Sequence, residues 1–557
     1  MRFIAAEIMI PTSLVLNNPT YQMLPTTLFN HSYGRSQKIS INCAIFSSTH
    51  LSFQVGAHKG ANSTSLTLEN IVWPSPDDKI PFWEKSVDSS NAIVDVPVTV
   101  NKDSDLVHVV HVTAEMAPVA KVGGLGDVVT GLARACMARG HTVNVMLPLY
   151  ECLPKQQLSE LTLICTYNSY HDGKWIPTNA YRAVASGIPV ILIEPDNHFF
   201  KGQRIYGGSY DELEAYLYFT RACLEWMQKP RIVLTIHNME HYGECRKEQF
   251  CKSGLNADVF ATTDKALDDR TIGHNPERLS LLKGGIVYSN AVITVSPTYL
   301  KETLNSGWLS GTLIKYCDKY SGILNGIDIA LWNPAADVFL PAVFTAQKLD
   351  GKAICKQYVQ RGLGLPAEPV EAGSDRKPLV VCVTRKMVVN HFQICGWTDG
   401  CTGKAATSRV EKEFEGLAAL HNQGPSIRIL LIHSEELSHM LYAAADMVLV
   451  PSIYEPCGLA QMIGMRYGAV PVVRRTGGLA DTVFDMDDHS NPEMSNGFVF
   501  EGIDEGSLNW SLERAFKFYF EKPDEWKKLV QKIMEIDNSW NNAAGKYITI
   551  YNSVKAR

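Results

Sequence analysis

Two kinds of hydrophobic pattern alternate along the chain from about residue 106 onward. Short runs of apolar, often β-branched residues predict strands that are buried on both faces of a sheet. Longer segments with apolar residues three and four positions apart predict helices. An alternation of strands and helices predicts an α/β fold with a parallel sheet wound on both sides. The clearest strands cover residues 107–112, 143–147, 190–193, 232–236, 379–383, 429–432, 447–450 and 470–473, and the clearest helices cover residues 128–136, 211–227, 510–520 and 526–537.

The first predicted strand, residues 107–112, runs into a glycine turn that opens a helix. Gly123 and Gly124 lack a side chain, so the backbone can come close to a bound group. Free N–H groups at a helix start attract anions, and Lys121 adds a positive charge. Asp127 fits the helix dipole as a cap, or accepts hydrogen bonds from a sugar. The turn indicates an anion or sugar site. A tight strand–helix turn with a solvated lysine is the alternative, because the spacing is neither Gly-x-Gly-x-x-Gly nor a P-loop.

Three further segments place polar residues after predicted strands, where the carboxyl ends of parallel strands line a ligand crevice. His237 follows the strand at residues 232–236, and a structural histidine is its alternative. Glu455 lies beside the helix start at Cys457 and Gly458, and a plain capping acid is its alternative. Cys457 has no evident histidine partner, which argues against a catalytic thiol. The third segment is a second glycine turn, formed by Arg475, Thr476, Gly477 and Gly478.

The composition restricts the classes of protein that fit. A chain of 557 residues is too long for one hydrophobic core, so two main domains are expected. The net charge of −6 gives no basic field and argues against nucleic acid as a partner. The 13 cysteines include no Cys-x-x-Cys pair, which argues against a zinc site or a disulfide framework. No long uninterrupted apolar run occurs, so no membrane span is expected.

The start of the chain differs from the rest in composition. Residues 1–68 carry a single acid, Glu7, among several basic residues and many Ser and Thr residues. An acid-poor, hydroxyl-rich leader is typical of an organelle transit peptide, and a disordered tail is the alternative. Both interpretations place residues 1–68 outside the fold. Residues 69–105 are rich in Pro and Asp and are interpreted as a linker.

The string at residues 115–128, Glu-Met-Ala-Pro-Val-Ala-Lys-Val-Gly-Gly-Leu-Gly-Asp-Val, resembles the N-terminal signature of starch synthases and bacterial glycogen synthases. Among starch synthases, classes III to V are the most similar. The resemblance extends over about residues 106–552. It implies the GT-B glycosyltransferase fold, in which two Rossmann-like domains face each other across a cleft. The expected domains are residues 106–333 and 334–525, with residues 526–557 crossing back to the first domain.

The resemblance also implies an activity and a location. Members of this family are retaining glucosyltransferases that transfer glucose from ADP-glucose to the non-reducing end of an α-1,4-glucan. We therefore expect ADP-glucose as donor, an α-1,4-glucan as acceptor, and neither a metal nor a cofactor. The expected process is starch biosynthesis in the stroma of a plastid, either a chloroplast or an amyloplast. Proteins of starch-granule initiation are the expected protein partners.

In the family, positively charged side chains bind the diphosphate of the donor. The resemblance implies that Lys121 and its glycine turn lie beside the sugar nucleotide in the cleft. Arg385 matches an arginine that grips the diphosphate, and Arg475 stands where the family has a lysine at the start of its second glycine loop. Fixed positive groups and helix starts are expected to stabilise the negative charge that builds on the leaving diphosphate.

The family's sugar-binding groups are present as well. The resemblance implies that His237 contacts the transferred glucose and that Glu455 binds its hydroxyls. The backbone of Cys457 and Gly458 is expected to face the sugar, and Asp127 is expected to help position it. Such groups accelerate transfer by holding the reacting sugar in line.

Two departures from the family pattern bear on activity. Between Trp226 and Arg231 the chain lacks a strand–helix unit that the family has, which would leave ladder groups uncovered. After Arg385 the Gln-Lys-Gly loop is absent, and a second unit is lost or replaced before Ser408. We therefore expect a weaker transferase than an intact family member. The alternatives are a catalytically impaired scaffold that binds glucan at granule initiation, and a chain that does not fold well.

Overall fold

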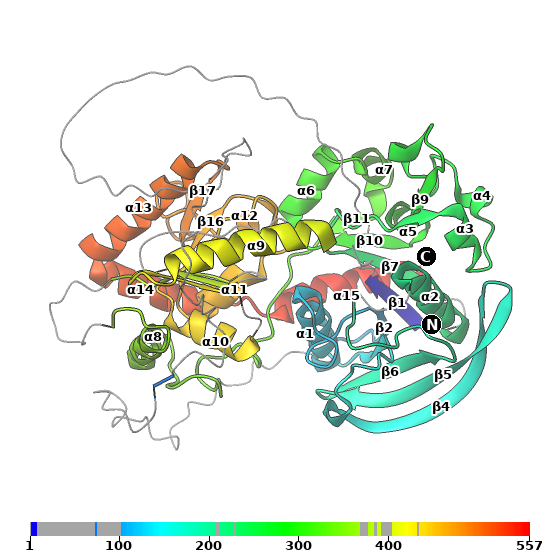
Figure 1. Ribbon diagram of the computed structural model, residues 1–557, viewed down its shortest axis with the longest axis horizontal. Coiled ribbons are helices and arrows are strands. Elements are labelled where there is room, and N and C mark those ends of the chain that lie inside the picture. The colour runs from blue at the N-terminus through cyan, green and yellow to red at the C-terminus, as the bar shows by residue number, and fades with distance from the viewer. Residues whose placement is uncertain are drawn as a thin grey trace, which may run out of the picture.

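The computed structural model describes residues 2–7, 73–74, 102–206, 211–227, 230–367, 377–383, 387–390, 404–431 and 434–556 (Figure 1). For residues 2–7, 387–390 and 404–411 the description covers the backbone elements and not the side chains. The described residues form two α/β domains, each built on its own sheet, that lie side by side.

The first domain is built on a nine-stranded sheet in the order β11-β10-β7-β1-β2-β3-β6-β5-β4. All neighbours from β11 to β6 are parallel, whereas β5 and β4 form an antiparallel edge. A separate antiparallel pair joins β8 and β9. The strands are β1 (Arg2–Glu7), β2 (His108–Val112), β3 (Thr142–Pro148), β4 (Leu158–His171), β5 (Lys174–Ala185), β6 (Ile188–Pro195), β7 (Arg231–Ile236), β8 (Glu244–Arg246), β9 (Arg278–Ser280), β10 (Ala291–Thr294) and β11 (Tyr320–Gly322).

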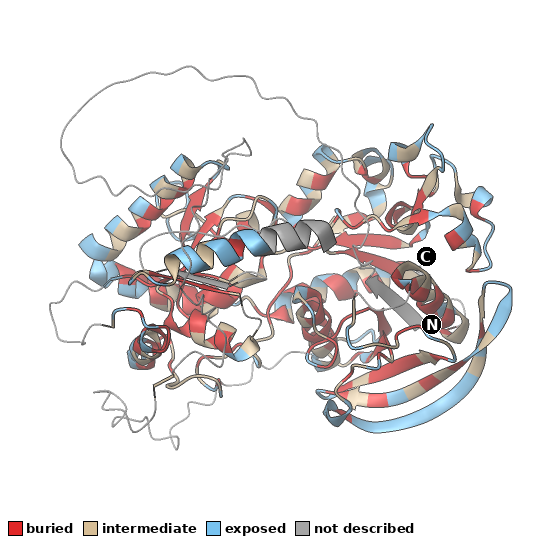
Figure 2. Cartoon of the chain, in the orientation of Figure 1, coloured by how far each residue is buried: buried red, intermediate tan, exposed pale blue. Residues whose placement is uncertain are grey.

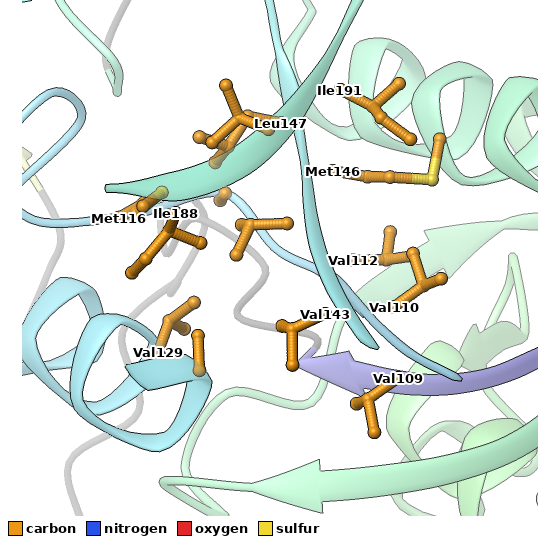
Figure 3. Packing of buried hydrophobic residues seen from close by; sticks show 14 of the residues in the cluster. Val109, Val110, Val112, Met116, Val129, Val143, Met146, Leu147, Ile188 and Ile191 are labelled. Atoms are coloured by element: carbon orange, nitrogen blue, oxygen red, sulfur yellow. The ribbon is translucent and has the colours of Figure 1, made fainter. Parts of the chain in front are cut away.

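Helices cover both faces of this sheet, as expected for parallel strands joined by crossovers. Figure 3 shows the core where β2, β3, β6 and the first helix meet, filled by Val109, Val110, Val112, Met116, Val129, Val143, Met146, Leu147, Ile188 and Ile191. The helices of the domain are α1 (Gly124–Ala138), α2 (Glu212–Met227), α3 (Lys247–Cys251), α4 (Ala257–Phe260), α5 (Leu281–Tyr288), α6 (Pro297–Asn305) and α7 (Ser310–Lys315).

The second domain is built on a six-stranded sheet in the order β14-β13-β12-β15-β16-β17. The neighbours from β12 to β17 are parallel, and β13 is antiparallel to both of its neighbours. The strands are β12 (Val380–Cys382), β13 (Met387–Asn390), β14 (Ile427–Leu430), β15 (Met447–Val450), β16 (Val470–Arg474) and β17 (Phe498–Phe500). The helices are α8 (Asp350–Gly362), α9 (Lys404–His421), α10 (Glu435–Ala444), α11 (Leu459–Arg466), α12 (Gly477–Thr482), α13 (Glu505–Glu521) and α14 (Pro523–Glu535).

The last helix, α15 (Trp540–Ala556), leaves the second domain and packs in the core of the first (Figure 1, red). Trp540, Tyr547 and Tyr551 are buried there, at most 4% exposed. The helices α1 and α15 approach closely because Gly131 has no side chain: a Cβ at Gly131 would lie 2.1 Å from Nε1 of Trp540. A helix therefore crosses back to the first domain, but the crossing begins at Trp540 and not at residue 526 as expected, because the apolar face of α14 packs in the second domain.

The structure differs from the sequence-based expectations in β1 and in the pair formed by β4 and β5. Residues 1–68 were expected to lie outside the fold, yet Arg2–Glu7 forms β1 at the centre of the first sheet. The antiparallel pair β4 and β5 was not predicted, because β4 is largely exposed and lacks a continuous apolar run (Figure 2). The segment after residue 386, where a strand–helix unit was expected to be lost or replaced, contains β13, which is antiparallel to both of its neighbours.

Among the residues that the structure describes, no helix combines the length and the apolar character that crossing a bilayer requires.

Candidate active site

Two helix starts, one from each domain, meet where the domains face each other. In the first domain, β2 leads through the Lys121 turn into α1, and in the second, β15 leads through the Glu455 turn into α11. A Cβ at Gly124 would lie 3.2 Å from Cδ1 of Leu459, the first residue of α11. The absence of a side chain at Gly124 thus allows the close approach of the two domains, and the two predicted turns face one cleft.

The Lys121 turn is held in shape by Glu115, a buried carboxylate to which sequence reasoning assigned no role. The backbone N–H groups of Val122 and Gly123 donate to Oε2 of Glu115 at 2.9 and 2.8 Å. The hydroxyl of Tyr206 donates to Oε1 at 2.9 Å. The Gly123 N–H was expected to stabilise the donor diphosphate; in this conformation it donates to Glu115, which orders the loop.

Lys121 joins the two domains through its ammonium group. Nζ lies 3.0 Å from Oδ1 of Asp127 on α1 and 3.3 Å from Oε1 of Glu435 at the start of α10. Burial alone would lower the pKa of Lys121, but the two carboxylates outweigh it and raise the pKa. Burial raises the pKa of Asp127, and Lys121 opposes this shift. Asp127 pairs with Lys121 rather than capping α1, whose N-cap is Gly123 with no side-chain cap.

His237 lies directly after β7, at the carboxyl end of a central strand, as predicted. Burial lowers its pKa to about 4, so its imidazole is neutral at physiological pH. A neutral imidazole can donate through one nitrogen and accept through the other, which suits contact with a sugar hydroxyl. The loop after His237 is fixed because the N–H of Met239 donates to the hydroxyl of Tyr299 at 2.8 Å.

The Glu455 turn is braced by its own side chain and by the first domain. Oε2 of Glu455 accepts from the Ser452 hydroxyl at 3.0 Å, and Oε1 accepts from the N–H of Gly458 at 3.2 Å. Gly458 is the N-cap of α11 and has φ of 69°, a left-handed conformation that glycine adopts without strain. The neighbouring Tyr454 packs edge-on against Tyr299 of α6, with ring centroids 5.5 Å apart. Tyr299 therefore contacts both the His237 loop and the Glu455 turn.

Cys457 is a structural residue. Burial raises the pKa of its thiol to about 12, so no thiolate is available at neutral pH. Its sulfur accepts a hydrogen bond from Nδ2 of Asn325 at 3.0 Å. Asn325 lies in the segment that links the two domains and is 3% exposed. This contact supports the sequence-based argument against a catalytic cysteine, and it shows that the segment containing Asn325 contacts the Glu455 turn.

The second glycine turn packs against the Glu455 turn of the same domain. A Cβ at Gly477 would lie 2.1 Å from the carbonyl oxygen of Glu455, and a Cβ at Gly478 would lie 1.9 Å from that of Cys457. Only glycine fits at either position, so these two residues set the position of the Glu455 turn. Arg475 has a different environment: its Nε lies 3.3 Å from Oε1 of Glu501, and both side chains are well exposed.

This turn forms hydrogen bonds with a helix of the first domain. Oε1 of Glu302, on α6, accepts from the N–H of Gly477 at 2.9 Å and from the Thr476 hydroxyl at 3.2 Å. In return, Asp481 on α12 accepts from the N–H and the hydroxyl of Thr298, at 2.9 and 2.7 Å. Thr476 and Gly477 were expected as donor-binding groups; in this conformation they hold the domains together.

Arg385, the expected diphosphate ligand, lies outside the described residues, as do Lys386 and residues 391–403. Among the described residues, the cleft contains the half-buried ammonium group of Lys121 with its two carboxylate partners, the neutral imidazole of His237 and the carboxylate of Glu455. A cation suits an anionic leaving group, and the other two suit sugar hydroxyls. Lys121 and Glu455 lie on the two facing turns, and His237 follows β7, in a loop that contacts the Glu455 turn through Tyr299.

The chain matches known protein families over most of its length. It matches the family described as starch synthase catalytic domain over residues 108–232 and 227–315, and glycosyl transferases group 1 over residues 386–533. It is 38% identical over 495 residues to probable starch synthase 4, chloroplastic/amyloplastic, of Arabidopsis thaliana, which covers 80% of this chain and 46% of that protein. The chain thus spans about half the length of this relative.

Two further relatives match over their whole length. A glycogen synthase of Protochlamydia amoebophila is 34% identical over 510 residues, which covers 81% of this chain and 100% of the relative. The solved catalytic domain of starch synthase IV from Arabidopsis thaliana bound to ADP and acarbose superposes with a TM-score of 0.73 at 36% identity. That match covers 81% of this chain and 100% of the solved domain.

These matches confirm the predicted family, the predicted GT-B arrangement of two Rossmann-like domains, and the predicted enzyme class, a hexosyltransferase. The chain belongs to the starch synthase and bacterial glycogen synthase family of glycosyltransferases.

Proposed function

We propose that the protein transfers glucose from ADP-glucose to the non-reducing end of an α-1,4-glucan, with retention at the anomeric carbon. In this reaction the bond from C1 to the diphosphate oxygen breaks, a bond from C1 to the acceptor oxygen forms, and the hydroxyl proton is released. The main support for this proposal is that the Lys121 and Glu455 turns meet across the cleft. In addition, the similar catalytic domain of starch synthase IV was solved bound to ADP and acarbose.

The charges in the cleft suit this reaction. Lys121 stays protonated because two carboxylates raise its pKa, so it supplies a fixed positive charge near the leaving diphosphate. His237 and Glu455 supply hydrogen-bonding groups for the sugar hydroxyls. In this proposal the protein's own side chains stabilise the diphosphate, and neither a metal ion nor a cofactor takes part.

The direct test is incorporation of radiolabelled glucose from ADP-glucose into maltoheptaose by the full chain, with an intact starch synthase measured alongside. We expect incorporation, at a lower kcat than that of the intact enzyme, because the Gln-Lys-Gly loop after Arg385 is absent. Glu455→Gln should abolish it, and Glu521→Gln, at an exposed position at the end of α13, should not. No incorporation above that of the Glu455→Gln variant would overturn the proposal.

For the location, we propose a plastid, with starch-granule-initiation proteins as the expected partners. Support comes from the acid-poor composition of residues 1–68 and from the chloroplastic/amyloplastic relative. Fusion of residues 1–70 to a fluorescent protein in plant cells should give a plastid signal, and a diffuse cytosolic signal would contradict it.

A further inference from the structure

The centre of the first sheet is occupied by a strand from the far end of the chain. Strand β1 lies between β2 and β7 and is parallel to both (Figure 1, dark blue). Arg2 to Ala6 pair with His108 to Val112, and Phe3 to Glu7 pair with Arg231 to Thr235. Both ladders of the central position are thus provided by six residues that precede the rest of the domain by about a hundred positions.

The position of β1 cannot be left empty. Without it, β2 and β7 would face each other across about 9.5 Å, twice the spacing of neighbouring strands. Both strands are buried: Val109 and Val233 are 0% exposed, and Val110 and Leu234 are 1% exposed. These values hold with β1 in place; without β1, the facing N–H and C=O groups of both strands would lose their ladder partners, which is unfavourable. The two strand edges therefore form a slot that requires an extended peptide.

No nearby segment of the chain can fill this slot. The helix α2 ends at Met227 and β7 begins at Arg231, so the connection between them is too short to contain a strand. The match to the starch synthase catalytic domain breaks at the same place, since its two stretches end at residue 232 and restart at residue 227. The strand that the internal sequence does not supply comes instead from residues 2–7.

An apolar cavity lies beside the slot, on the face of the sheet that α2 and α5 cover. It has a volume of about 340 Å³ and lies between the sheet and the helices α2 and α5. Its walls are almost entirely apolar, and they include residues from both strands that border the slot. Among the lining residues are Val112, Leu217, Ile232, Leu234, Phe260 and Tyr288. Strand β1 thus fills the position of the missing strand in the sheet. The cavity is the part of the adjoining space that no helix fills.

We propose that the slot between β2 and β7 is a strand-acceptor site and that Arg2–Glu7 of this chain is its occupant. The sequence Arg-Phe-Ile-Ala-Ala-Glu suits a buried parallel strand, because four apolar residues lie between two charged end positions. A slip of one residue would move a charged position into the buried part of the ladder, so the register is well defined. Cutting the chain after residue 68 would empty the slot, so the plastid location proposed above requires import that leaves residues 2–7 attached to the chain.

The first test compares two substitutions in the full chain. Ala5→Pro removes an N–H from the middle of β1, and Ala5→Ser keeps it, so the two variants differ in their ability to join the ladder. We expect Ala5→Pro to lower the Tm by about 6 °C or more and Ala5→Ser to change it by less than about 2 °C. Equal Tm values for Ala5→Pro and the unmodified chain would overturn the proposal.

The second test keeps the strand and cuts its tether. A protease site is inserted between residues 30 and 68 of the full chain, upstream of Trp73, which itself packs against Tyr358. The folded protein is cut and passed over a size-exclusion column. We expect the N-terminal fragment to co-elute with the body, and to separate from it when the cut chain carries Ala5→Pro. Separation from the unsubstituted body with no change in Tm would overturn the proposal. Both tests measure folding and association, so their outcome is independent of transferase activity.

Discussion

The charged residues of the cleft acquire their roles from the residues around them in the fold, which their positions in the sequence do not reveal. Lys121 has a carboxylate partner on each side of the interdomain boundary, Asp127 and Glu435. Glu115 uses both of its oxygens to shape the loop that carries Lys121. The glycine turn and Lys121 were predictable, because they form a contiguous pattern. Glu302 and Glu435 were not, because each is an ordinary acid on a helix until the tertiary fold brings it to the site.

Replacing Lys121 tests the source of the positive charge. Lys121→Met should lower kcat by about 100- to 1000-fold, because a preorganised cation next to the leaving diphosphate is lost. The control is Lys528→Met, an exposed lysine on α14 that should leave kcat unchanged within about twofold. Steady-state rates with ADP-glucose and maltoheptaose measure the effect. An equal rate for the Lys121→Met variant and the unmodified chain would show that other groups stabilise the leaving diphosphate.

Two buried histidines should make the protein less stable in mild acid. Burial lowers the pKa of both His111 and His237 to about 4. The unfolded chain binds their protons near pH 6.5, so between pH 6.5 and 4 it binds more protons than the folded one. Stability must therefore fall as the pH falls through this window, by at most about 3 kcal/mol for each group.

The measurement is Tm from pH 7.5 to 4.5. We expect a smaller acid-induced fall for His111→Leu than for the unmodified chain, and an unchanged fall for His489→Leu, which replaces an exposed histidine. If His111→Leu and His489→Leu show the same fall, the acid sensitivity has another origin.

At the scale of whole elements, the limits of sequence-based prediction follow from physics. The strands β2, β3, β6, β7, β15 and β16 were predicted because strands buried on both faces are continuous apolar runs. The edge strand β4 is 14 residues long and mostly exposed, so it has no such run. The Asp172–Gly173 turn between β4 and β5 was the available signal for this hairpin. The short apolar run of β1 was passed over because it lies in a segment assigned to a leader, and only distant strands define its place in the sheet.

The apolar cavity between α2, α5 and the sheet gives a prediction about packing. Ala266 lines this cavity, so Ala266→Val should fill space and stabilise the protein by about 1 kcal/mol, which raises Tm by about 2–4 °C. Ala133→Val is the matched control, because Ala133 is 0% exposed in the close-packed core around α1. That variant should lower Tm through overpacking. Opposite signs for the two variants in thermal unfolding would confirm the cavity, and a fall for both would contradict it.

At the scale of the whole molecule, the two domains are fastened by matched contacts at helix starts. Glu302 of α6 binds the start of α12, and Asp481 of α12 binds the start of α6. Each carboxylate also faces the positive end of the partner helix dipole, so the pair favours the closed arrangement. The Arg134–Asp328 ion pair and the Asn325–Cys457 contact lie along the same boundary.

Removing these contacts should let the domains separate. The double variant Glu302→Gln, Asp481→Asn is expected to increase the radius of gyration in small-angle scattering and to speed amide exchange at Thr298 and Gly477. Glu513→Gln, at an exposed position on α13, serves as the control and should change neither quantity. Unchanged scattering and exchange in the double variant would show that other contacts hold the closed form.

The placement of α15 has a consequence for synthesis on the ribosome. The first domain needs Trp540, Tyr547 and Tyr551 to complete its core, and these residues leave the ribosome last. The second domain, although encoded later than most of the first, has all its strands and helices before that point. The nascent first domain must therefore wait, incomplete, while the second emerges. A premature stop before residue 540 should consequently damage the domain that was made first.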